Sequence, residues 1–140
     1  MKADTAHEHW DAAWAEVDGT SKWERAEPEV MDFARQLPEG ARVLDLGAGV
    51  GRHALALAQV GFDATAFDAA PTGLEVLAQK AGAAGLTIAT DVGKMDVLPY
   101  DDASFDHVLS WNVIYHGDEA VLKRTIAEIA RVLKPGGTFL

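Results

Sequence analysis

Residues 43–53 read VLDLGAGVGRH, a run of branched apolar residues that leads into three glycines within five positions. The apolar run is typical of a buried strand, and the residues after the glycines follow a helical pattern that ends near Gly61. Because glycine has no side chain, such a turn lets a ligand lie directly against the backbone. A tight turn between a strand and a helix needs glycine as well, so the cluster alone leaves a purely structural role open.

The chain around this stretch alternates between strand-length and helix-length patterns. The predicted strands are RVLDL (42–46), FDATAFD (62–68), LTIAT (86–90), FDHVLSWNVIY (105–115) and TFL (138–140). Helices are predicted over 51–61 and 71–85, and a third within 118–137 has an apolar stripe of Leu122, Ile126, Ile129 and Leu133 and a stop at Pro135, Gly136 and Gly137. This alternation predicts an α/β fold with a parallel sheet, whose ligands bind beyond the carboxyl ends of the strands.

Residues 1–40 are predicted to form a helical N-terminal cap on a core that spans residues 41–140, the two making a single domain. The segment HEHWDAAWAEV has Trp10, Trp14 and Val17 on one helical stripe. The segment EPEVMDFARQL opens with Pro28, which is favourable in a first helical turn. The apolar face of this second helix consists of Val30, Phe33, Ala34 and Leu37.

Composition limits the possible partners. The 140 residues are 49% hydrophobic and carry a formal charge of −10, so the chain has material for one core and a surface that repels phosphate and anionic lipid. We therefore expect neither nucleic acid nor a membrane as a partner. The absence of cysteine excludes disulfides, thiolate nucleophiles and zinc–cysteine sites. The sequence has no leader-like or membrane-spanning segment, so the expected location is the cytoplasm.

Two features distinguish the glycine turn from a plain turn. The dinucleotide fingerprint G-x-G-x-x-G requires glycine at position 52, where this chain has Arg52, and the third glycine is Gly51 instead. In addition, Asp68 ends the second predicted strand, 17 residues after Gly51. A carboxylate there can accept two hydrogen bonds from a ribose diol. Together these features predict a ribose-bearing ligand that lies over the glycine turn.

In four motifs the chain resembles the class I S-adenosylmethionine-dependent methyltransferases, especially their small-molecule group. The motifs are VLDLGAGVGRHALALA, FDATAFDAAP, LPYDDASFDHVLSWNVIYH and EIARVLKPGGTFL. The resemblance implies a Rossmann-like, doubly wound sheet of about five strands in the order 3-2-1-4-5, truncated from the seven strands of the family. It also implies S-adenosyl-L-methionine as cofactor, its amino-acid end held by Asp45, Gly47, Ala48, Gly49 and Gly51. Asp68 would hold the ribose, and Ala69 would lie against the adenine.

One departure from the family pattern concerns the adenine. Many relatives read GDM after the third strand, and the acid of that motif binds the adenine amino group, whereas this chain reads Gly93-Lys94-Met95. Lysine has no acceptor. The resemblance therefore leaves this contact either lost or moved to Asp96, with Met95 packing on the ring. The other interpretation of Asp96 is a solvated loop acid.

The residues SWNVIYH that end the fourth predicted strand are expected to form the acceptor side of the pocket. Trp111 and Tyr115 would form the walls of this pocket. Trp111 would lie beside both the cofactor and the acceptor. His116 is the candidate base, the alternative being an ordinary loop histidine, and His53 is expected to contact the cofactor. In-line methyl transfer needs alignment, exclusion of water and at most removal of a proton, so no metal site is expected.

The expected activity is methyl transfer from S-adenosylmethionine to a small-molecule acceptor by in-line displacement. Two other classes stay open: a catalytically silent cofactor-binding or interaction domain and, disfavoured by Arg52, a nicotinamide-dependent oxidoreductase. Because the sequence ends at GGTFL, where the family continues, the fifth strand is expected to be a sheet edge with apolar Phe139 and Leu140. We expect a homodimer through that edge, the alternative being a fragment of a longer protein.

Overall fold

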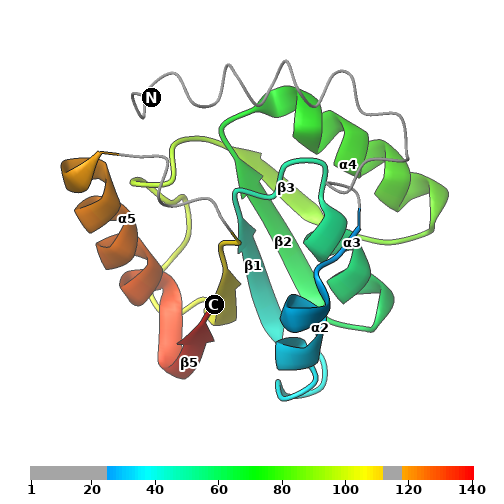
Figure 1. Cartoon of the computed structure of the whole chain (residues 1–140), viewed down its shortest axis with the longest axis horizontal. Coiled ribbons are helices and arrows are strands. Elements are labelled where there is room, and N and C mark those ends of the chain that lie inside the picture. The colour runs from blue at the N-terminus through cyan, green and yellow to red at the C-terminus, as the bar shows by residue number, and fades with distance from the viewer. Residues whose placement is uncertain (1–24, 112–117) are drawn as a thin grey trace.

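The computed structural model describes residues 25–111 and 118–140. Along the chain its elements are α2 (Pro28–Ala34), β1 (Arg42–Leu46), α3 (Arg52–Gln59), β2 (Asp63–Asp68), α4 (Pro71–Ala83), β3 (Ala89–Val92), β4 (Phe105–Leu109), α5 (Glu119–Val132) and β5 (Leu133–Phe139). The strands form a five-stranded parallel sheet in the order β3-β2-β1-β4-β5 (Figure 1). The predicted doubly wound α/β fold and its strand order are confirmed.

Helices cover both faces of this sheet (Figure 1). Val43 of β1 packs in a buried cluster with residues of α2, α3 and α4, whereas Leu44 and Leu46 pack in a second cluster with residues of α5. Successive side chains of a strand point to opposite faces, so the unbroken apolar run of β1 supplies both layers. The strand order reverses between β1 and β4, and ligands of such sheets bind at the carboxyl ends of the strands near that reversal.

The prediction for the N-terminal third is confirmed in part. The helix that opens with Pro28 is present as α2, with Val30 and Ala34 buried. The first predicted helix, with Trp10, Trp14 and Val17, lies outside the described residues. No helix in the described part of the chain is long and apolar enough to cross a membrane.

The prediction for the third strand was wrong by three residues. Leu86 is not in a strand, because its amide donates to the carbonyl of Ala81 at 2.9 Å and closes the end of α4. β3 instead pairs with β2 so that Val92 lies opposite Asp68. The apolar pattern misplaced this strand because its four residues lie at the sheet edge, and most of them are exposed.

The apolar stripe predicted for α5 was wrong in part. Ile129 is buried, but Ile126 is 51% exposed, and Thr125 and Val132 are buried instead. The hydroxyl of Thr125 donates to the carbonyl of Val121 at 2.8 Å. This hydrogen bond satisfies the hydroxyl inside the core, which is why a polar residue can take the place of an apolar one.

The predicted stop of this helix at 135–137 was also wrong. α5 ends at Val132, and Pro135, Gly136 and Gly137 lie within β5. Pairing between β4 and β5 is irregular, and a Cβ on Gly137 would lie 2.8 Å from the carbonyl oxygen of Lys134, so glycine is needed there. Proline is tolerated because β5 is an edge strand of the sheet. β4 likewise ends at Leu109, so Ser110 and Trp111 follow the strand rather than belong to it.

Candidate functional site

The loop between β1 and α3 holds the three glycines at the carboxyl end of β1. Gly47, Gly49 and Gly51 have φ values of 81°, 59° and 83°. These lie in the left-handed region, which other residues adopt at a cost. The amides of Gly47 and Ala48 both donate to the carbonyl of Phe67, at 2.8 and 3.0 Å. The loop is therefore fixed to the end of the neighbouring strand β2.

Asp68, the last residue of β2, faces this loop. Its Oδ2 accepts a hydrogen bond from the amide of Gly49 at 2.8 Å, and its Oδ1 accepts one from the amide of Ala70 at 2.8 Å. Asp68 is half-buried, as is Ala69 beside it. The structure thus brings together the glycine turn and the acid that the sequence predicts as the ribose contact. The two amide hydrogen bonds hold both oxygens of its carboxylate in place.

Asp45 lies beneath the loop and is 3% exposed. Its Oδ2 accepts from the amide of Ala54 at 3.1 Å, in the first turn of α3. Gly51, the N-cap residue, has no side chain for this purpose. Burial raises the pKa of Asp45 to about 7, assisted by the nearby charge of Asp68 and opposed by the Ala54 amide and by Arg52. Asp45, the acid of the first motif, therefore caps the start of α3 from beneath the loop. Its predicted contact with the cofactor stays a prediction.

Gly51 has a packing reason to be glycine. A Cβ at this position would lie 2.3 Å from Cδ1 of Leu77, a fully buried residue of α4. The third glycine therefore lets α3 approach α4 closely. Its predicted contact with the cofactor stays a prediction.

His53 is buried inside the start of α3. Its Nε2 accepts from the amide of Glu27 at 3.1 Å, and its ring meets that of Trp111 edge-on, with centroids 6.4 Å apart. Burial and the charge of Arg52 lower the pKa of His53 to about 4, so the ring is neutral near pH 7. Arg52 binds the same segment, with its Nη1 3.2 Å from Oε1 of Glu27. His53 and Arg52 thus tie the start of α2 to the glycine loop, a role that the sequence did not indicate.

The segment after β3 approaches Asp68 from the other side. The amide of Gly93 donates to the carbonyl of Asp68 at 3.1 Å, and Met95 packs against the buried cluster on the α5 face. The side chain of Asp96 is only 13% exposed, and Nη2 of Arg124 lies 3.0 Å from its Oδ2. The interpretation of Asp96 as a solvated loop acid was therefore wrong, because an arginine of α5 covers it.

Two of the predicted acceptor residues, Tyr115 and His116, lie outside the described residues. Trp111 is half-buried after β4 and contacts the cluster beneath the glycine loop. In residues 25–111 and 118–140, no three His, Asp or Glu side chains gather closely enough to hold a metal ion.

The glycine loop lies where the strand order reverses, with an acid at the end of the neighbouring strand, and sheets of this kind bind nucleotide ligands at that place. The family model described as "Methyltransferase domain" matches residues 43–137. The chain belongs to the methyltransferase domain family. This membership confirms the resemblance to the class I S-adenosylmethionine-dependent methyltransferases that the four motifs indicate.

Curated relatives of this methyltransferase domain are longer proteins. The chain is 42% identical over 111 residues to "Uncharacterized methyltransferase Rv3342" of Mycobacterium tuberculosis, covering 79% of this chain and 42% of the relative. It is 38% identical over 106 residues to a ubiquinone biosynthesis O-methyltransferase of Methylocella silvestris, covering 75% of this chain and 40% of the relative. The domain thus spans less than half the length of these relatives.

A solved structure agrees with the fold. The YcgJ protein of Bacillus subtilis is 30% identical and superposes with a TM-score of 0.71, covering 79% of this chain and 47% of the other. The glycine loop, β1 and β2 therefore belong to an architecture that the family shares.

Proposed function

We propose that this domain binds S-adenosyl-L-methionine over the glycine loop and supports methyl transfer to a small-molecule acceptor. The observation that carries the proposal is the carboxylate of Asp68, held by the amides of Gly49 and Ala70 at 2.8 Å each. Each carboxylate oxygen has two acceptor positions. A carboxylate held in this orientation at the strand end is suited to accept from the hydroxyls of a ribose that lies over the loop.

The charge of the site supports a cationic ligand. S-adenosylmethionine carries a sulfonium, an ammonium and a carboxylate, so its net charge is positive. Asp68 lies at the loop, and the chain as a whole has a formal charge of −10. Opposite charge stabilises the bound cofactor and raises the rate of its association. The glycines of the loop would leave room for its amino-acid end, and Ala69 would lie beside its adenine.

When bound, the cofactor supplies an electrophilic methyl group on a positively charged sulfur. The residues of this chain have to align the acceptor with that methyl and exclude water. Trp111, half-buried beside His53, is proposed as one wall of the pocket, with Tyr115 and His116 completing the acceptor side. The acidic surface favours a small acceptor over nucleic acid, and the relatives named for ubiquinone biosynthesis support the same class.

Calorimetric titration with S-adenosylmethionine, S-adenosylhomocysteine and NAD tests this proposal. We expect both S-adenosyl compounds to bind and NAD not to bind. Asp68→Ala should weaken binding about 10- to 100-fold, the usual loss for a hydrogen bond to a charged group. Asp63→Ala is the matched control, because Asp63 begins the same strand at its other end and is 66% exposed.

The outcomes separate a domain that binds the S-adenosyl compounds from an oxidoreductase and from an interaction domain without this cofactor. Unchanged affinity in Asp68→Ala would contradict the proposed site. Binding of NAD alone would favour an oxidoreductase, and binding of none of the three would favour an interaction domain. A thermal unfolding scan of each variant shows whether a lost signal reflects the site or the fold.

A further inference from the structure

A short segment before α2, residues 25–27, lies against the first turn of α3, and we call it the strap. Nη1 of Arg52 donates to the carbonyl of Arg25 at 3.3 Å and to Oε1 of Glu27 at 3.2 Å. The amide of Glu27 donates to Nε2 of His53 at 3.1 Å. Arg52 and His53 come directly after the glycine loop, at the start of α3. The strap therefore borders the proposed cofactor site.

His53 joins the strap to the other side of this site. The residue is 3% exposed, and its ring meets that of Trp111 edge-on, with centroids 6.4 Å apart. Trp111 follows β4, the neighbour of β1 at the point where the strand order reverses. Nε2 of His53 can accept from the strap only while it carries no hydrogen, and burial with the charge of Arg52 lowers the pKa of His53 to about 4. One buried ring thus contacts both a backbone amide of the strap and the proposed wall of the acceptor pocket.

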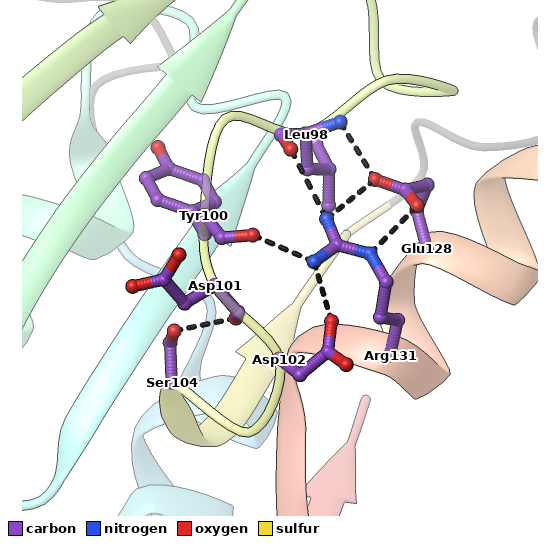
Figure 2. Close-up of polar contacts among 7 residues, drawn as sticks. All are labelled: Leu98, Tyr100, Asp101, Asp102, Ser104, Glu128 and Arg131. Carbon is purple, nitrogen blue, oxygen red and sulfur yellow. Dashed lines mark hydrogen bonds and ion pairs between the residues drawn. The ribbon is translucent and has the colours of Figure 1, made fainter.

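The strap is held less firmly than the segment between β3 and β4. Figure 2 shows Arg131 of α5 bound to backbone carbonyls of that segment, and the hydrogen bonds of its guanidinium are 2.7–3.1 Å long. Those of the strap are 3.1–3.3 Å long, and the side chain of Glu27 is 41% exposed. The helix that follows, α2, has seven residues and is too short to be stable by itself. We therefore expect local opening of the strap to cost far less free energy than unfolding of the domain.

We propose that His53 is a positioning residue that keeps the strap closed beside the bound cofactor and thereby slows its dissociation. This inference rests on the proposed function. Opening of a segment that borders a site often limits the release of product, so the strap would determine how fast the used cofactor leaves. This role differs from the direct contact with the cofactor that the sequence predicts for His53, and the experiment distinguishes the two.

The experiment measures the dissociation rate of S-adenosylhomocysteine from the 140-residue chain by surface plasmon resonance. His53→Leu has no acceptor for the amide of Glu27, and we expect dissociation to become about 3- to 10-fold faster, the range of one hydrogen bond. His53→Gln keeps an acceptor and should restore most of the slow dissociation.

Two variants of Glu27 remove the same contact from its other partner. Glu27→Pro has no amide hydrogen, and the backbone at this position, with φ −70° and ψ 131°, is one that proline adopts. Glu27→Ala loses only the ion pair with Arg52 and keeps the amide. We expect Glu27→Pro to speed dissociation about 3- to 10-fold relative to Glu27→Ala, as His53→Leu does relative to wild type.

His107→Leu is the matched control. His107 is also 3% exposed and stacks on Phe33 of α2, with centroids 5.1 Å apart. Its Nδ1 lies 2.7 Å from Oγ1 of Thr138 in β5, so it does not contact the strap. We expect this variant to leave the dissociation rate unchanged.

Positioning through the strap requires that the double variant His53→Leu/Glu27→Pro dissociate no faster than the faster single variant. Faster dissociation in His53→Leu, without a difference between Glu27→Pro and Glu27→Ala, would indicate a direct contact of His53 and overturn the inference. Equal acceleration in His107→Leu would indicate general loosening of α2 and overturn it too, as would equal acceleration in His53→Gln or an unchanged rate in His53→Leu.

Thermal unfolding scans show whether each variant folds. If His53→Leu does not fold, the comparison of Glu27→Pro with Glu27→Ala decides, because the side chain of Glu27 is partly exposed and its backbone suits proline. If the wild-type domain binds S-adenosylhomocysteine and these two variants release it at equal rates, this inference fails alone. If the wild type does not bind it, the proposed function fails as well.

Discussion

The glycine loop and the segment after β3 are fixed in opposite ways. At the glycine loop, small residues and buried polar groups determine the backbone: Gly51 touches Leu77, and Asp45 caps α3 from a position that is 3% exposed. After β3, charged side chains from the partly exposed face of α5 hold backbone groups of Leu98 and Tyr100. Changes at the first region must therefore cost much of the stability of the fold, whereas changes at the second should mainly alter local position.

The largest effect is expected at Gly51. Gly51→Ala would place a Cβ 2.3 Å from Leu77 at a φ of +83°, so it combines overpacking with backbone strain. We expect a loss of about 3–4 kcal/mol in the free energy of unfolding, measured by chemical denaturation. Gly61→Ala is the control, because Gly61 has a φ of +98° but nothing within 4 Å of the new Cβ. It should lose only about 1 kcal/mol. Similar losses in both variants would show that strain alone governs the loop.

The next effect concerns the pH dependence of stability through Asp45. Its folded pKa of about 7 lies above the ordinary value of 3.8, so the folded state binds more protons than the unfolded state between these values. The contribution of Asp45 is fully present below pH 3.8 and is lost as the pH rises through 7. Between pH 5 and pH 8, the wild type should lose about 2–3 kcal/mol relative to Asp45→Asn.

Asparagine keeps an acceptor for the amide of Ala54 but has no charge. The difference between the two pH profiles therefore removes any constant effect of the substitution. Parallel profiles would mean that Asp45 titrates near its ordinary pKa. Water would then reach its carboxyl group more than its low exposure indicates.

What the sequence revealed differs between the two regions for a physical reason. Gly47, Gly49 and Asp68 were predicted because a glycine turn and a strand-end acid are local patterns, and parallel strands bring them to one edge. The cap formed by Asp45 was not predicted, because it joins a strand to a helix across the turn. Neither was the exposed character of β3, since an edge strand carries little apolar signal.

The role of Arg124 and Arg131 was not predictable from patterns of apolar residues. Their partners lie about 30 residues earlier, and charges on a helix face are usually solvated. One signal was present: Arg124, Glu128 and Arg131 form a stripe of alternating charge on one face of α5. A charge stripe of this kind does not reveal which polar groups of a neighbouring segment it binds. The structure was therefore needed to identify Leu98 and Asp96 as its partners.

A moderate effect is expected for Arg131. Arg131→Ala removes five hydrogen bonds from a side chain that is 31% exposed and leaves Glu128 without its closest cation. We expect a loss of about 2 kcal/mol in unfolding free energy, because several of these hydrogen bonds are charge-assisted but partly solvated. Lys134→Ala, which breaks a more exposed pair with Asp106, should change stability by less than about 0.5 kcal/mol. If the two losses are equal, the segment after β3 is held by its apolar contacts instead.

The smallest effect is expected at His53 and has the opposite pH sign to that of Asp45. The folded pKa of His53, about 4, lies below the ordinary value of 6.5, so its stabilising contribution is fully present above pH 6.5 and is lost as the pH falls through 4. His53→Gln keeps an acceptor for the amide of Glu27 but does not titrate. From pH 7 to pH 5, the wild type should lose about 1–2 kcal/mol relative to this variant, measured by denaturation at each pH. As the pH falls over the same interval, the contribution of Asp45 increases the free energy of unfolding. The two effects would largely cancel in the wild-type profile, so the comparison with the variant is needed to detect either. A wild-type profile parallel to that of His53→Gln would show that the histidine is not held neutral, and the tie between α2 and the glycine loop would then need another acceptor for Glu27.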